Sequence, residues 1–185
     1  MHSNLSPKMT LRRSWYTSSF QDFFASSVPE ILGELQQHCE FEVLPTQSAA
    51  WEEQILILRA ALVNLDGRLH FEFIVPRIGS RIDVVLVVKA VVMVLEFKTG
   101  VGEIDRAAED QVWDYALDLK YFHEASHATA IAPLLVSNSI SPLTPFNLHA
   151  DGDRLFRPVH VHPTQLGEIL QEIIRGVSGE GIDPA

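Results

Sequence analysis

The chain has 185 residues, of which 46% are hydrophobic and 21% are charged, and its formal net charge is −10. This length and composition fit one globular domain with a sizeable core, and the apolar runs are too short and too charged for a membrane span. The first residues lack the apolar core of a signal peptide, so we expect a cytoplasmic protein. The single cysteine, Cys39, excludes an intrachain disulfide.

The negative charge argues against non-specific attraction to nucleic acid, because phosphate contacts need Lys or Arg side chains. Basic residues nevertheless gather around the middle of the chain, where they could form a local basic rim: Arg77, Arg81, Lys98, Arg106 and Lys120. The composition therefore disfavours a broad nucleic-acid-binding surface and leaves room for a local one.

We expect an N-terminal tail with a short helix over residues 1–26, a main domain over 27–176 and a C-terminal tail over 177–185. Ser27 and Glu30 have the spacing of a capping box, which predicts a helix from Val28 to His38. A second helix is expected to begin near Ser48, with one apolar stripe formed by Trp51, Ile55, Leu58 and Leu62.

Three strands are expected next. The segment from Arg68 to Val75 alternates, which places Phe71, Phe73 and Val75 on one face and His70, Glu72 and Ile74 on the other. Glu72 shares the side of Asp83 by parity, as a third acidic group, although a solvent-facing position is favoured. The apolar run from Ile82 to Phe97 predicts a hairpin that turns at Lys89-Ala90.

Side-chain parity in this hairpin brings charged residues together. Arg81 and Asp83 share one face of the first strand, Glu96 and Lys98 share one face of the second, and Asp83 is expected directly opposite Glu96. Cross-strand Cβ atoms lie about 4.5–5.5 Å apart, so two carboxylates at these positions could hold one divalent cation. Without the cation they would repel each other. The alternative is a structural ion pair, Asp83 with Lys98 or Glu96 with Arg81.

The second half of the chain alternates helices and strands. Periodicity predicts a helix from Asp105 to His123, with Gln111 and Tyr115 one turn apart on the same side. A strand over 130–136, a long loop over 138–155 and a short strand over 156–162 should follow. Thr164 is expected to cap a final amphipathic helix. The order of elements indicates an α/β fold with a mixed sheet flanked by helices.

Three sequence motifs together resemble the PD-(D/E)XK nuclease superfamily, most closely its RecB-like pattern: Arg81-Ile82-Asp83, Glu96-x-Lys98-Thr99-Gly100 and Gln111-x-x-x-Tyr115. The stretch from residue 71 to 138 is also similar to the N-terminal region of bacterial P-loop helicase-like proteins of uncertain function. The resemblance implies a restriction-endonuclease-like fold for residues 27–176. No Walker-type motif is present in the chain, so a helicase-like ATPase would be a separate or linked partner.

The resemblance also implies roles for individual residues. Asp83 and Glu96 would bind Mg²⁺ or Mn²⁺ with the backbone carbonyl of Phe97, and Lys98 would orient or deprotonate the attacking water. Gln111 would position a carboxylate or a phosphate. Tyr115 would brace Gln111 or stack on a base, with core packing as the favoured alternative. Accessory roles fall to Arg81, Glu72 and an acidic residue of the second helix, either Glu53 or Glu52.

The implied function is a metal-dependent deoxyribonuclease that hydrolyses DNA phosphodiester bonds, acting with a helicase in DNA repair or defence. The alternative is a catalytically inactive module of the same fold that binds nucleic acid or a partner protein.

Two histidine pairs, His123 with His127 and His160 with His162, have zinc-compatible spacings but no third ligand, and we expect ordinary surface histidines. Trp113 could stack on single-stranded nucleic acid, although core packing is favoured.

Overall fold

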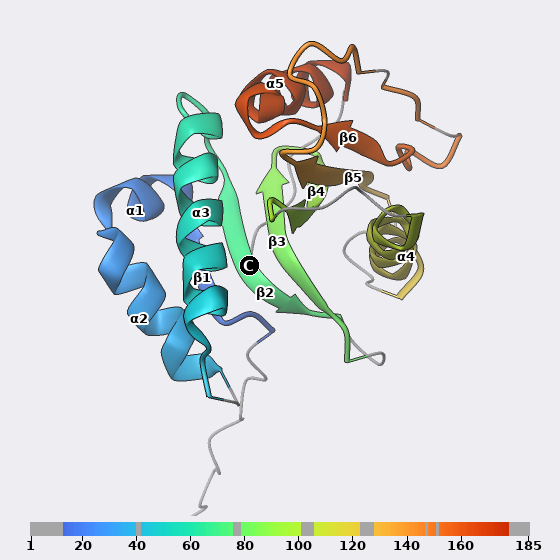
Figure 1. Ribbon diagram of the computed structural model, residues 1–185. Coiled ribbons are helices and arrows are strands. Elements are labelled where there is room, and N and C mark those ends of the chain that lie inside the picture. The colour runs from blue at the N-terminus through green and yellow to red at the C-terminus, as the bar shows by residue number, and fades with distance from the viewer. Residues whose placement is uncertain are drawn as a thin grey trace, which may run out of the picture.

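The computed structural model describes residues 13–39, 42–75, 79–100, 106–122, 128–146, 148–150 and 152–177. Over these residues a six-stranded sheet forms the centre of the protein, in the order β1-β2-β3-β4-β5-β6 (Figure 1). The strands are β1 (Tyr16–Ser19), β2 (Arg68–Ile74), β3 (Arg81–Val88), β4 (Val91–Lys98), β5 (Ala130–Ser137) and β6 (Val159–Val161). The first four strands pair antiparallel, whereas β4–β5 and β5–β6 pair parallel. The expected mixed sheet is confirmed.

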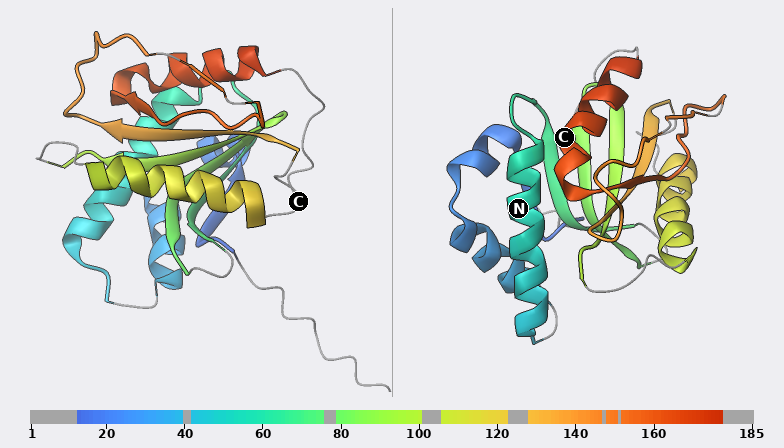
Figure 2. Two further views of the ribbon diagram at one scale, coloured as in Figure 1. Left: turned by 90° about the vertical axis from the view of Figure 1, so that its right-hand side faces the viewer. Right: turned by 45° about the horizontal axis from the view of Figure 1, so that its top comes forward.

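The helices divide unequally between the two faces of the sheet (Figure 2). A larger core contains buried residues from α1 (Phe20–Ala25), α2 (Val28–His38), α3 (Pro45–Ala61) and α5 (Leu166–Gly176). A smaller core on the other face is closed by α4 (Arg106–Phe122), which buries Ala108, Val112, Tyr115, Ala116 and Leu119. Because α4 connects the parallel strands β4 and β5, its place on the sheet face follows from the crossover that such strands require.

Several sequence predictions for single elements are confirmed. The capping box of α2 is formed, since the Ser27 side chain accepts a hydrogen bond from the Glu30 N–H and the Glu30 carboxylate accepts one from the Ser27 N–H. The β3–β4 hairpin turns at Lys89-Ala90 and pairs Val84 with Leu95. No helix of the described residues combines the length and the apolar character that crossing a bilayer demands.

The segment before α2 corrects the sequence prediction. Residues 1–26 were expected to be a tail with a short helix, and α1 is that helix, but β1 precedes it as an edge strand of the sheet. Trp15, Phe20 and Phe23 are buried in the larger core. Residues 13–26 therefore contribute an edge strand to the sheet and buried side chains to the larger core.

Two helix starts also differ from the prediction. α3 begins at Pro45 instead of near Ser48, since proline is well suited to the first turn of a helix, where its missing N–H costs nothing. Thr164 does not cap α5; it lies in a 3₁₀ turn, Pro163–Gln165, whose N-cap is His162. The Nδ1 atom of His162 accepts the N–H of Thr164 at 3.3 Å.

β2 does not keep one face toward one core, as its alternation predicted. Phe71 packs in the larger core, but Phe73 and Val75 pack in the smaller one. Between them Glu72 adopts a φ of 50°, in a region that non-glycine residues rarely occupy. This local conformation turns the strand over, so the side chains on either side of Glu72 serve different cores.

Candidate active site

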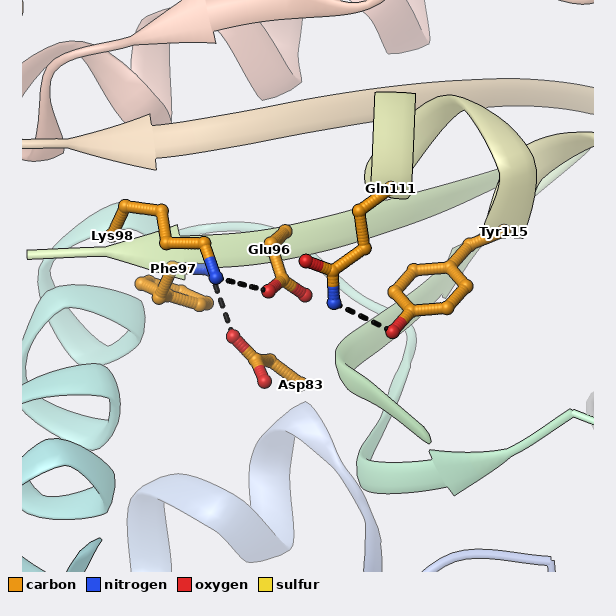
Figure 3. Close-up of polar contacts among 6 residues, drawn as sticks. All are labelled: Asp83, Glu96, Phe97, Lys98, Gln111 and Tyr115. Atoms are coloured by element: carbon orange, nitrogen blue, oxygen red, sulfur yellow. Dashed lines mark hydrogen bonds and ion pairs between the residues drawn. The ribbon is translucent and has the colours of Figure 1, made fainter. Parts of the chain in front are cut away.

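The candidate site lies where β3 and β4 part. Their backbone ladder ends at Val84 and Leu95, and the same register continued by one step sets Asp83 across from Glu96. Beyond the ladder, the Asp83 side chain provides the hydrogen bond between the two strands, because its Oδ2 atom accepts the N–H of Phe97 at 2.8 Å (Figure 3). Asp83 is thereby fixed at the end of β4, beside the strand that carries Glu96 and Lys98.

Glu96 is the most deeply buried acid of the site. Its side chain is 4% exposed, and its Oε1 atom accepts a hydrogen bond from Lys98 Nζ at 2.9 Å. Its Oε2 atom is also buried, yet it has no hydrogen-bond partner among the described residues. A buried carboxylate oxygen without a donor is costly, so this atom is where a further ligand would be most favourable.

The surroundings of Asp83 and Glu96 disfavour the charged form of both carboxyl groups. Burial, and then the nearby Glu96 carboxylate, raise the pKa of Asp83 well above its usual range. Burial also raises the pKa of Glu96, although the hydrogen bond from Lys98 opposes this. For Lys98, burial alone would lower the pKa, but the hydrogen bond and charge of Glu96, helped by Asp83, raise it above its ordinary value. Lys98 is therefore a cation at neutral pH.

α4 brings Gln111 and Tyr115 to this site, one turn apart on the same side of the helix, as their spacing predicted. The Gln111 Nε2 atom donates to the Tyr115 hydroxyl at 2.7 Å, and both side chains lie on the side of Glu96 (Figure 3). Tyr115 is 7% exposed and packs in the smaller core. Burial raises the pKa of Tyr115, and the charges of Glu96 and Asp83 add to that rise. Tyr115 thus combines core packing with a hydroxyl that holds Gln111.

Glu72 corrects the prediction of a solvent-facing side chain. It is 6% exposed, and its carboxylate accepts the indole N–H of Trp51 at 2.8 Å. Its Oε2 atom lies 3.4 Å from Arg81 Nε. Burial raises the pKa of Glu72, while Trp51 and Arg81 lower it in part. The positive φ at this residue turns the side chain inward, so Glu72 joins the acidic group that parity had indicated.

The structure distinguishes Glu53 from Glu52, which the sequence left open. Glu53 Oε2 accepts the Thr99 hydroxyl at 2.7 Å, and its Oε1 atom lies 3.4 Å from Asn138 Nδ2. Asn138 Nδ2 also donates to the Thr99 carbonyl at 2.9 Å. Glu52 is exposed. Glu53 is therefore the α3 acid that reaches the end of β4, next to Lys98.

Sequence reasoning missed several residues around the site. The guanidinium of Arg81 lies 4.3 Å from the centre of the Trp15 ring, and Trp15 packs edge-on against Trp51. No local pattern could have revealed these contacts between distant segments. For Asn138 a signal existed: β4 and β5 are parallel, with Lys98 paired to Ser137, and parallel strands end at the same edge of a sheet.

The residues present fit a hard divalent cation in their chemistry. Asp83 and Glu96 offer carboxylate oxygens, the ligand type that Mg²⁺ prefers, and Glu96 has an oxygen with no partner among the described residues. Their mutual repulsion would be relieved by a bound positive charge. No group of three or more His, Cys, Asp or Glu side chains within the described part of the chain is arranged to hold a metal by itself. Water and substrate would have to complete the coordination.

The remaining sequence candidates lie away from this site or outside the described residues. His160 Nε2 lies 3.3 Å from a Glu109 carboxylate oxygen, and His162 caps a 3₁₀ turn. The second pair, His123 and His127, lies outside the described residues. Lys120 is buried and donates to the Thr129 carbonyl, so it cannot belong to a basic rim.

No protein-family model, curated protein or solved structure matches this chain. The case for a function therefore depends on the residues of the site itself.

Proposed function

We propose that this protein hydrolyses phosphodiester bonds in DNA in a reaction that depends on Mg²⁺ or Mn²⁺. The observation that carries the proposal is the convergence of Asp83, Glu96 and Lys98, with one buried Glu96 oxygen left without a partner among the described residues. Without a ligand, charges placed in this way lower the stability of the fold. They are favourable once a cation and an anionic substrate are present.

Each side chain has a role in this proposal. Asp83 and Glu96 would hold the cation, which when bound polarises the scissile phosphate and offsets the charge that develops on it. Lys98 donates to Glu96 at 2.9 Å and remains 43% exposed, so its ammonium can also meet the phosphate or orient the attacking water. Gln111 is oriented by Tyr115 and can hold a phosphate oxygen or a carboxylate.

The proposed restriction-endonuclease-like fold and RecB-like membership agree with this arrangement. The antiparallel hairpin of β3 and β4 and the crossover helix α4 after the Lys98 strand carry the three motifs in the order of the RecB-like pattern. Glu53 on α3 completes the set of acidic positions. A linked or associated helicase-like ATPase would be the source of the DNA strands.

A second candidate, an inactive module of the same fold that binds a partner protein, is favoured by one feature. A cavity of about 570 Å³ beside Gln111 and Tyr115 is also lined by Asp110, Asp114 and Asp118. These carboxylates repel phosphate and would attract a basic surface. The two candidates differ in whether DNA is cleaved and whether the cation is bound.

Cleavage of plasmid and single-stranded DNA by the purified chain tests the proposal. We expect cleavage with Mg²⁺ or Mn²⁺, none after chelation, and a loss of about 10²-fold or more in Asp83→Ala and Lys98→Ala, since each removes a group that acts on the reacting phosphate. Lys89→Asn is the matched control, because Lys89 is an exposed turn residue with positive φ, a conformation that Asn tolerates. Undiminished cleavage by a folded Asp83→Ala or Lys98→Ala protein would contradict the proposal.

A further inference from the structure

A cavity of about 590 Å³ opens beside the acid pair, and Gln111 is not among the residues that line it. Asp83 lines it together with Glu72, Arg81, Trp15 and Gln47. Asp83 is thus shared between this cavity and the candidate active site. A group in the cavity would lie next to whatever the acid pair acts on.

Arg81 is the feature of the cavity that has no role in holding a cation. Its Nε atom faces Glu72 at 3.4 Å, and its guanidinium lies over the Trp15 ring at 4.3 Å. Glu72 is itself fixed by Trp51 at 2.8 Å. Arg81 is held on two sides by a buried carboxylate and a buried indole, while its side chain remains 40% exposed. It therefore presents a preorganised planar cation at the wall of the cavity.

The dimensions and chemistry of the cavity suit a single nucleotide. Its volume lies within the range of about 300–1,000 Å³ that is usual for small-molecule sites. A planar guanidinium can stack on a nucleobase or contact a phosphate, and Gln47 and Glu72 can pair with base donors. A duplex cannot enter such a cavity with its bases paired, because a base reaches a pocket only after it leaves the stack.

We propose that this cavity binds one unpaired nucleotide next to the scissile phosphate, so that the enzyme prefers single-stranded DNA or frayed ends. The inference rests on the proposed function and adds a substrate class to it. Arg81 is the specificity-determining residue, and Trp15 and Glu72 position it. Its guanidinium stacks on the base or contacts the adjoining phosphate.

Binding measurements test this inference without requiring cleavage. In a Lys98→Ala background with Mn²⁺, the fluorescence anisotropy of a labelled single strand is compared with that of the same strand annealed to its complement. We expect tighter binding of the single strand, and Arg81→Gln should weaken that binding about tenfold, the order expected for one base-stacking contact. Binding of the duplex should change little.

Two further variants distinguish the stacking of the Arg81 guanidinium from its positive charge and from general effects of a substitution on the fold. Arg81→Lys keeps the charge and loses the planar guanidinium, so it should also lose the preference for the single strand. Arg157→Gln is the matched control, because Arg157 also lies over an indole, that of Trp113 at 5.1 Å, but does not line this cavity. It should leave both affinities unchanged.

An abasic nucleotide moved stepwise along the single strand tests the pocket from the side of the substrate. At one position of the strand, the missing base should weaken binding to the Lys98→Ala protein. The same missing base should have no effect when Arg81→Gln is added. The inference would be overturned if Arg81→Gln lost the same affinity for the single strand as for the duplex, or if the protein bound the duplex more tightly than the single strand. Failure of the wild-type protein to cleave any DNA would refute the proposed function alone, since the subsite is judged by the binding data.

Discussion

At the scale of single residues, the positions of Asp83 and Glu96 carry an electrostatic cost. Glu96 is buried beside Asp83. Burial raises the pKa of each acid, and the Glu96 carboxylate raises that of Asp83 further. Natural proteins tolerate such arrangements mainly at functional sites, where the cost is recovered when a ligand binds. The pair should therefore limit stability in the absence of a cation.

Asp83→Asn should stabilise the metal-free protein at neutral pH. The amide removes one of the two repelling charges, and its oxygen can still accept the Phe97 N–H. We expect a gain of about 0.5–2 kcal/mol in the free energy of unfolding, the usual size for relief of functional strain. Urea denaturation measures it, with exposed Asp66→Asn as the control. A loss of stability specific to Asp83→Asn would mean that the carboxylate is a structural partner.

The convergence of these residues could be predicted because a strand has only two faces. Once the turn at Lys89-Ala90 was recognised, parity alone brought Asp83 opposite Glu96 and put Lys98 on the same side. Parity also put Glu72 on the Asp83 side, but the solvent-facing position favoured for it was wrong, because a positive φ at a non-glycine residue leaves no mark in the sequence. The indole contacts of Trp15 and Trp51 depend on tertiary packing and were equally invisible.

At the scale of elements, α3 connects the site to the larger core. It supplies Trp51 to Glu72 and Glu53 to Thr99, so its position decides where these acids lie. Its far end is held by α5, where Gly167 packs against the backbone of Ala61. The sequence predicted the middle of α3 from its apolar stripe, whereas its start at Pro45 and the close approach of α5 depend on contacts between distant segments.

Gly167→Ala should destabilise the protein through this contact. A Cβ atom at this position would come within 3.1 Å of the Ala61 carbonyl oxygen and 3.3 Å of its Cα, and backbone atoms there cannot move aside easily. We expect a loss of about 1–3 kcal/mol, as for other overpacked sites. Gly176→Ala is the matched control in the same helix, because a Cβ there meets nothing within 4 Å. Equal stability of the two variants in urea denaturation would show that α5 can shift freely.

At the scale of the whole molecule, the candidate site lies where the two helical layers meet the end of the central sheet. α4 reaches it from one face through Gln111, and α3 reaches it from the other through Glu53 and Trp51 (Figure 1). The sequence predicted a mixed sheet because an expected antiparallel hairpin is followed by strands that a helix connects. It missed β1 because a short edge strand carries too few residues for a clear alternation.

The pH dependence of stability should reflect the raised carboxyl pKa values. An acid whose pKa is higher in the folded state stabilises the fold below its unfolded value, near 3.9 for Asp, and this contribution is lost as pH rises through the folded value. His70 acts with the opposite sign: burial lowers its pKa to about 4, so its contribution is lost as pH falls below 6.5.

The difference between wild type and Asp83→Asn removes the His70 contribution, because both proteins contain that residue. We expect the stability advantage of Asp83→Asn to be small near pH 4 and to grow as pH rises through the folded pKa of Asp83. Urea denaturation of the metal-free proteins over a pH series measures this difference. An advantage that stays constant with pH would show that Asp83 has the same pKa in the folded and unfolded states.

The most direct test of the account is the binding of Mn²⁺ to the metal-free chain, measured by isothermal titration calorimetry and by the shift of the melting temperature. Wild type should bind the ion and melt at a higher temperature, since a ligand that binds only the folded state stabilises it by mass action. Asp83→Asn and Glu96→Gln should lose both effects, whereas exposed Glu52→Gln should keep them. Binding that is absent in wild type, or unchanged in both site variants, would contradict the central claim that Asp83 and Glu96 form a metal site.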